Sequence, residues 1–222
     1  NNGNIERTKD NNAYDTITNE DESKSIQIAR TNVSESNPTG DSQIGDAMTE
    51  NIVTQGHDGE AGSSRYTYLQ IQNYDAATQF FEFAGSNTKV EFGQDALSFC
   101  DGFSTNIVST NHTVNSSSNV ATTIGYVDVS EPGSASRHFI NNATLQERVH
   151  SHPQGSDWGP SGFYVSRNRK TGNLTVQPTY KNPIGDRNTY SSNVENTYQY
   201  TPGVGYFKYN KDTATYIGKT KK

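Results

Sequence analysis

The sequence predicts one folded unit of mixed α/β (α+β) class, in which a central sheet is flanked by helices. A helix-like pattern of apolar residues begins near Asp75, and several segments with the alternation typical of strands follow it. The 222 residues suffice for one core of ordinary size but hardly for two full domains.

The first predicted element is a short amphipathic helix over residues 76–84. Ala76, Phe80 and Phe83 recur at a spacing that places apolar side chains on one side of a helix. The Gly-Ser-Asn triplet at residues 85–87 follows and predicts the C-cap and a turn.

Strands are predicted downstream of this helix. They cover residues 89–92, 105–112, 120–129 and 144–152, and a terminal hairpin spans 198–216 around Pro202-Gly203. In the first strand, Val90 and Phe92 face one side and Glu91 the other. Glu91 is therefore expected to look into a cleft while its neighbours anchor the strand.

Residues 1–62 contain few apolar side chains and are rich in Asn, Asp, Thr, Ser and Glu. The whole chain is polar, with 30% hydrophobic residues and a mean hydropathy of −0.88. This composition predicts a polar linker or weak hairpins in residues 1–62, followed by the main domain in residues 63–222.

Charge and cysteine content exclude several classes of protein. The net charge of −6 argues against a nucleic-acid surface, because phosphate binding draws on clustered Lys and Arg. The Lys-Thr-Lys-Lys end is interpreted as a solvated tail. The single cysteine, Cys100, excludes a disulfide framework or an all-cysteine zinc cage, and is expected to be a small buried residue beside Phe99. No apolar run is long enough to span a bilayer and no signal peptide is present, so any export is expected to depend on something outside this chain.

The segment His150-Ser151-His152-Pro153 carries the strongest chemical signal. Side chains at i and i+2 of a strand point the same way, roughly 6.6 Å apart along the backbone. Two imidazoles at this spacing are half of a zinc site. Ser161 follows after seven intervening residues.

Glu91, then His-x-His-Pro, then seven residues and Ser161 resemble the JAMM/MPN metalloprotease motif, in which the serine is followed by x-x-Asp. The resemblance implies a cytidine-deaminase-like central sheet and a Zn²⁺ cofactor. It also implies that His150 and His152 are zinc ligands, that Glu91 is the general base, and that Ser161 donates a hydrogen bond to the oxyanion. These roles are chemically sensible, because zinc and a nearby carboxylate together activate water.

The chain departs from the family pattern at the third metal ligand. Tyr164 stands three residues after Ser161, where the family has its aspartate. Two acids offer a replacement: Asp186, which follows an apparent insertion, and Asp157, inside the seven-residue loop. We favour Asp186, since Asp157 would need a tight turn to reach the ion.

The resemblance implies a zinc-dependent peptidase or isopeptidase that is the C-terminal toxin or effector domain of a bacterial polymorphic toxin. Residues 2–10 also resemble a hairpin that precedes such domains in RHS-type toxins. A protein or peptide substrate and a cognate immunity protein are the implied partners, without nucleic acid. The implied location is outside the producing cell or inside a target cell.

The alternative is a non-catalytic, JAMM-like protein-binding module that lacks a complete metal site, and Tyr164 favours it. A nucleobase deaminase of the Pro-Cys-x-x-Cys type is excluded, because the chain has one cysteine.

Overall fold

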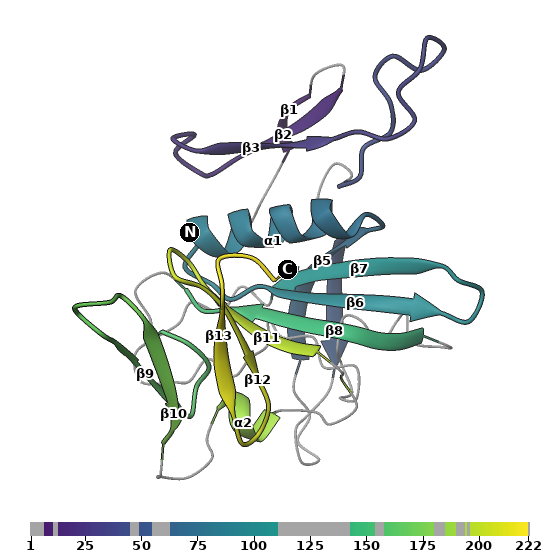
Figure 1. Ribbon diagram of the computed structural model, residues 1–222. Coiled ribbons are helices and arrows are strands. Elements are labelled where there is room, and N and C mark those ends of the chain that lie inside the picture. The colour runs from purple at the N-terminus through teal and green to yellow at the C-terminus, as the bar shows by residue number, and fades with distance from the viewer. Residues whose placement is uncertain are drawn as a thin grey trace.

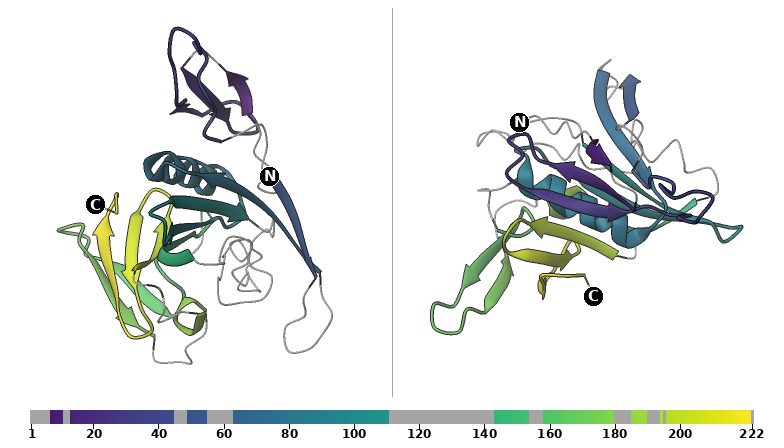
Figure 2. Two further views of the ribbon diagram at one scale, coloured as in Figure 1. Left: turned by 90° about the vertical axis from the view of Figure 1, so that its right-hand side faces the viewer. Right: turned by 90° about the horizontal axis from the view of Figure 1, so that it is seen from above.

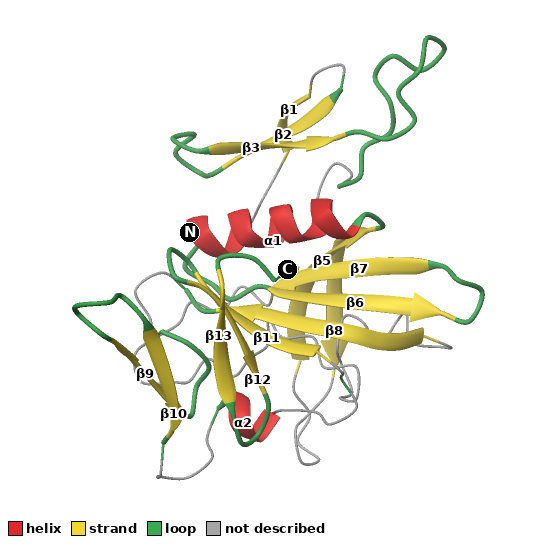
Figure 3. Cartoon of the chain, in the orientation of Figure 1, coloured by secondary structure: helices red, strands yellow, loops and turns green. Residues whose placement is uncertain are grey.

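The protein is built around a large mixed sheet that carries one long helix on one face (Figures 1 and 3). The computed structural model describes residues 7–10, 13–44, 49–54, 63–110, 143–153, 158–179, 185–189, 194 and 196–221. The helices are α1 (Tyr74–Asn87) and the single-turn α2 (Asp186–Thr189). The strands are β1 (Arg7–Asp10), β2 (Tyr14–Thr18), β3 (Ser25–Ala29), β4 (Thr49–Thr54), β5 (Ser63–Ile71), β6 (Gly93–Phe99), β7 (Ser104–Thr110), β8 (Ala143–Ser151), β9 (Phe163–Arg167), β10 (Leu174–Pro178), β11 (Asn196–Thr201), β12 (Gly205–Tyr209) and β13 (Ala214–Gly218).

The large sheet has eight strands in the order β13-β12-β11-β8-β6-β7-β5-β4. Neighbouring strands are antiparallel except β8 and β11, which run parallel. Strands β9 and β10 form a separate hairpin, and β1–β3 form a three-stranded sheet. The predicted fold class, a mixed α+β domain with a central sheet, is confirmed; the described residues contain one long helix beside that sheet.

Helix α1 confirms the predicted amphipathic helix but extends beyond the predicted end. The side chain of Asn73 caps its start by accepting a hydrogen bond from the Ala76 amide. Gly85 was expected in the C-cap and instead lies inside the helix, where a Cβ would stand 2.9 Å from Cβ of Ser151. Gly85 therefore allows α1 to approach β8 closely. The last turn is closed by Thr88, whose Oγ1 donates to the Ala84 carbonyl.

Alternation along the strands gives the large sheet two apolar faces. On the α1 face, Val108 and Val149 join a cluster with the phenylalanines of the helix. On the other face, Ile107 joins a smaller cluster with Leu97, Leu145 and Val194. The second face also carries His150 of β8, as described below.

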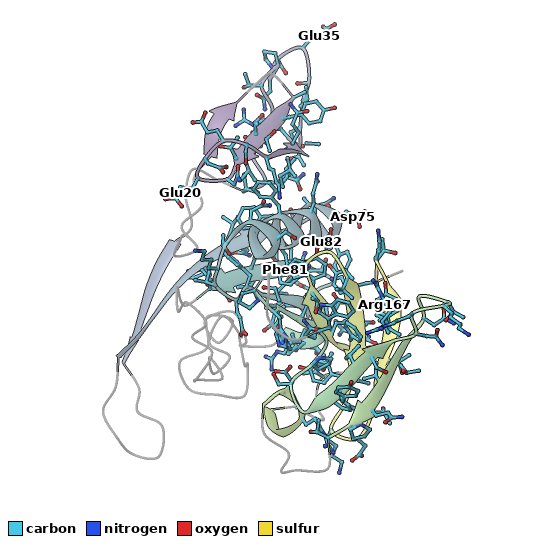
Figure 4. All side chains as sticks on the ribbon, turned by 90° about the vertical axis from the view of Figure 1, so that its left-hand side faces the viewer. Glu20, Glu35, Asp75, Phe81, Glu82 and Arg167 are labelled. Carbon is cyan, nitrogen blue, oxygen red and sulfur yellow. The ribbon has the colours of Figure 1, made fainter. Side chains whose placement is uncertain are left out.

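The sheet β1–β3 covers the outer side of α1, so the helix lies between two sheets (Figure 2). Ile17 and Ile28 are fully buried and belong to the same apolar cluster as α1. Figure 4 labels Phe81 and Glu82 on this helix. These strands fall within the segment predicted as a linker or weak hairpins, and the boundary after residue 62 stays a prediction.

Some of the predicted strands are confirmed and one is wrong. Residues 105–110 and 144–151 lie in β7 and β8, and the terminal hairpin is formed by β11 and β12, as predicted. The strand predicted at 120–129 lies outside the described residues. The strand predicted at 89–92 is wrong, because β6 begins only at Gly93. Residues 91–92 form isolated hydrogen bonds with neighbouring segments instead of a regular strand ladder. One example is the hydrogen bond that the Ser151 amide donates to the Phe92 carbonyl.

Two expectations about individual side chains are wrong. Cys100 is exposed, because it lies in the tight connection between β6 and β7. Lys221, expected in a solvated tail, has a side chain only 4% exposed and forms an ion pair of 2.7 Å with Oε1 of Glu147. Its ammonium group also lies over the rings of Tyr74 and Tyr206. Aromatic and acidic partners together explain why this lysine is buried.

Candidate metal centre

The end of strand β8 brings the two histidines of the motif to the face of the sheet opposite α1. Its alternation directs Val149 into the core with α1 and directs His150 to the other side. His152 follows the last strand residue, and its amide donates to the Tyr200 carbonyl on β11 at 2.9 Å. Both rings are almost fully buried, and their centroids are 5.2 Å apart.

Asp186 at the start of α2 completes the cluster. Its Oδ2 lies 3.2 Å from Nε2 of His150 and 3.4 Å from Nε2 of His152. The preceding Gly185 has φ +82°, a left-handed conformation that favours glycine. A Cβ on Gly185 would overlap Cβ of Ser161, so the glycine lets the chain pass close to this serine.

The three ligand atoms could hold a metal ion. All of them lie within 4.8 Å of one another, and the three side chains are buried. For Zn–N and Zn–O bonds of about 2.0–2.1 Å, two ligands of a tetrahedral ion are roughly 3.3 Å apart. The distances from Oδ2 of Asp186 to the two imidazole nitrogens bracket this value. Two imidazoles and one carboxylate also match the donor set of catalytic zinc sites, which leave a fourth position open.

Burial and the histidines act in opposite directions on Asp186. Removal from water raises the pKa of this carboxyl group, whereas the charges and hydrogen bonds of His150 and His152 lower it. The histidines prevail, so the pKa of Asp186 lies far below its usual range. The side chain is therefore a carboxylate at neutral pH, as a metal ligand must be.

Glu91 is brought to the histidines by the antiparallel pairing of β6 with β8. Gly93 lies opposite His150, and Phe92 is bonded to Ser151, so the chain leads Glu91 toward His152. The side chain is 7% exposed, and Oε2 accepts no hydrogen bond within the described part of the chain. Burial raises the pKa of Glu91 to about 7, although His152 and His150 lower it. A buried carboxylate with this pKa is suited to accept and release a proton near neutral pH.

Ser161 lies beside Asp186, to which its backbone amide donates a hydrogen bond of 2.6 Å. The predicted role of its hydroxyl at an oxyanion stays a prediction. Tyr164, at the position of the family aspartate, lies on β9 with 63% of its surface exposed. Asp157, the second choice for the third ligand, lies outside the described residues. The structure thus brings together Glu91, His150, His152, Ser161 and Asp186.

Two residues of this centre could not be identified from the motif. Gly185 determines how closely Asp186 approaches Ser161, and its only sequence signal is its place before the aspartate. Tyr209 of β12 approaches His150, with its hydroxyl 3.5 Å from Nδ1. The alternating Tyr206-Phe207-Lys208-Tyr209 segment indicates a strand but not which strand it lies near.

The site lies in a region that matches a known family. A family model described as JAB-like toxin 1 matches residues 69–178, which include Glu91, both histidines and Ser161 but end before Asp186. No curated protein and no solved structure matches the chain. Within the described residues, no helix has the length and apolar character needed to cross a membrane. The predicted resemblance is confirmed: residues 69–178 match a JAB-like toxin domain.

Proposed function

We propose that this domain is a zinc-dependent peptidase or isopeptidase that acts as a toxin. The observation that carries the proposal is the convergence of two imidazole nitrogens and one carboxylate oxygen on a space of zinc size, beside a buried glutamate. His150, His152 and Asp186 would hold the ion. When bound there, zinc would act as a Lewis acid that activates water and polarises the scissile carbonyl group.

Glu91 would act as the proton carrier. Its Oε2 is directed into a buried region and accepts no hydrogen bond from the described residues, so it is available to take a proton from water. The same carboxyl group would then deliver the proton to the leaving amine. A pKa near 7 serves both steps, because neither protonation state is strongly favoured at neutral pH.

Ser161 would serve the oxyanion through its hydroxyl group. Its amide is already bonded to Asp186, which fixes the serine backbone beside the proposed ligands. A hydroxyl donor held in this way needs little rearrangement when negative charge develops on the carbonyl oxygen. Ser161 therefore connects the third ligand with the proposed oxyanion site.

The family assignment supports a toxin delivered to a target cell. We infer that the substrate is a protein or peptide inside that cell, and that a cognate immunity protein protects the producer. We also infer that the chain is the C-terminal effector part of an RHS-type bacterial polymorphic toxin, secreted by machinery encoded elsewhere.

Zinc content of the purified chain tests the metal centre first. We expect one zinc per chain in the unmodified protein and in Asp157→Ala, and loss of zinc in His150→Ala, His152→Ala and Asp186→Ala. If Asp157→Ala loses zinc and Asp186→Ala keeps it, the third ligand is Asp157 and not Asp186. An unmodified protein that takes up no zinc after supplementation would favour the non-catalytic binding module.

Peptidase activity needs a separate measurement. A library of peptides and isopeptide-linked conjugates is incubated with the zinc-loaded protein, and cleavage products are identified by mass spectrometry. Glu91→Gln should keep its zinc and lose cleavage by about 10²–10⁴-fold, because only the proton carrier is removed. Cleavage that survives unchanged in Glu91→Gln would contradict the proposed mechanism.

A further inference from the structure

Tyr209 approaches the proposed zinc ligand His150 from a strand two positions away in the sheet. The sheet order β8-β11-β12 separates the two residues by one strand, and Tyr209 lies outside the residues that match the family model. The burial pattern of β12 places Phe207 and Tyr209 inside and exposes Lys208 between them. Tyr209 and His150 are 4% and 1% exposed, so water has almost no access to either side chain.

Both ring nitrogens of His150 face a polar group. Nε2 faces Oδ2 of Asp186 at 3.2 Å, and Nδ1 faces the Tyr209 hydroxyl at 3.5 Å. The two rings meet edge to face, with centroids 5.9 Å apart and an interplanar angle of 89°. This packing restricts rotation of the imidazole about its Cβ–Cγ bond, so the position of Nε2 depends on the tyrosine.

A hydroxyl group is chemically suited to this position. A metal on Nε2 requires the lone pair of that atom, so the ring hydrogen is on Nδ1 and needs an acceptor. Without metal, a hydrogen on Nε2 faces the Asp186 carboxylate, and Nδ1 becomes an acceptor that needs a donor. The tyrosine oxygen can accept in the first case and donate in the second.

We propose that Tyr209 is a positioning residue that orients His150 so that its Nε2 faces the ion. This inference rests on the proposed zinc site and goes beyond it, because it assigns the affinity of that site partly to a residue on β12. Tyr209 does not touch the ion or the substrate. Partners of this kind typically contribute 10–100-fold to metal affinity.

Zinc affinity of Tyr209→Phe tests the inference by competition against a chromogenic chelator. The variant keeps the ring and its packing but lacks the hydroxyl, so zinc should bind about 10–100-fold more weakly at unchanged stoichiometry. Tyr216→Phe on β13 is the matched control, since its hydroxyl donates to the Val204 carbonyl at 2.9 Å, and its zinc affinity should equal that of the unmodified protein. The unfolding midpoint measured in chelator shows whether Tyr209→Phe is still folded. It should change little, so that a weaker zinc affinity reflects the orientation of His150 and not a loss of folding.

A second measurement uses the unmodified protein. Long-range ¹H–¹⁵N spectra of the zinc-loaded chain should show His150 with its hydrogen on Nδ1, protected from exchange by Tyr209, and faster exchange in Tyr209→Phe. Equal zinc affinity in the two proteins, or equal exchange at Nδ1, overturns the role of Tyr209 while leaving the zinc site intact. Absence of zinc binding from every variant, the unmodified chain included, overturns both.

Discussion

The backbone amide of Ser161 donates a 2.6 Å hydrogen bond to Oδ2 of Asp186, a residue 25 positions further along the chain. The same oxygen faces Nε2 of both His150 and His152. The hairpin β9–β10 occupies the intervening chain, which explains how the carboxylate can be displaced from the family position at Tyr164 and still reach the histidines. A backbone group thus orients Asp186.

Gly185→Ala should weaken zinc binding through the position of Asp186. The new Cβ would overlap Cβ of Ser161, so the aspartate must move or the serine must shift. We expect a loss of about tenfold or more in zinc affinity, measured by chelator competition. Gly172→Ala is the control, since its φ of +75° imposes the same backbone strain but nothing lies within 4 Å of the added Cβ. Both variants should lose about 1–2 kcal/mol of stability from that strain. An equal zinc affinity in both would exclude the contact with Ser161 as the cause.

Glu91→Gln should alter how the stability of the metal-free protein depends on pH. The folded-state pKa of about 7 lies above the ordinary value of 4.5, so folding favours the protonated group. Its stabilising effect is complete below pH 4.5 and is lost as pH rises through about 7. The free energy of unfolding of Glu91→Gln, relative to the unmodified chain, should therefore increase between pH 4.5 and 8. Denaturant titrations in chelator measure it, and a difference that stays constant over this pH range would contradict the raised pKa of Glu91.

Lys221→Met should destabilise the protein by about 1–3 kcal/mol, because it leaves the partly buried Glu147 carboxylate without its cation. Tyr74 also donates to that carboxylate, at 2.7 Å, and would remain. Lys219→Met, at an exposed position two residues away, should change stability by less than about 0.5 kcal/mol. The double variant with Glu147→Gln should recover part of the loss in urea unfolding. Equal effects of the two lysine variants would show that the buried ion pair is unimportant.

Ile17→Ala tests whether β1–β3 and α1 fold as one unit. Ile17 is fully buried in the cluster that includes α1, so its truncation should reduce the free energy of unfolding by about 2–4 kcal/mol in a single transition. Val33→Ala, at a side chain 49% exposed, is the control and should have little effect. A separate early transition in Ile17→Ala, with the main transition unchanged, would support the predicted boundary after residue 62.

Local patterns predicted the elements that depend on neighbours in sequence. The spacing of His150 and His152 predicts both imidazoles on one side of an extended segment, which is the end of β8, and the apolar period over residues 76–84 specifies a helix. Such patterns do not specify strand order. The approach of Tyr209 to His150 depends on the order β8-β11-β12, which alternation alone leaves open.

Exceptions to local rules came from tertiary packing. Gly85 was expected to end the helix but instead allows α1 and β8 to approach, because Ser151 occupies the space of a side chain. Lys221 was expected in water because its neighbours in sequence are polar, whereas its partners Glu147 and Tyr74 come from distant segments. The residues next to Gly85 and Lys221 in the sequence indicate neither of these contacts.

The parallel pairing of β8 with β11 places the candidate metal ligand Asp186 in a long connection between the two strands. A parallel neighbour requires the chain to return across the sheet, and that long crossover holds Ser161, the hairpin β9–β10 and Asp186. An ion bound by the histidines and Asp186 would link β8 to α2 and close the loop between them, as a disulfide would. Removal of the ion by a chelator should therefore loosen this crossover before it affects the sheet.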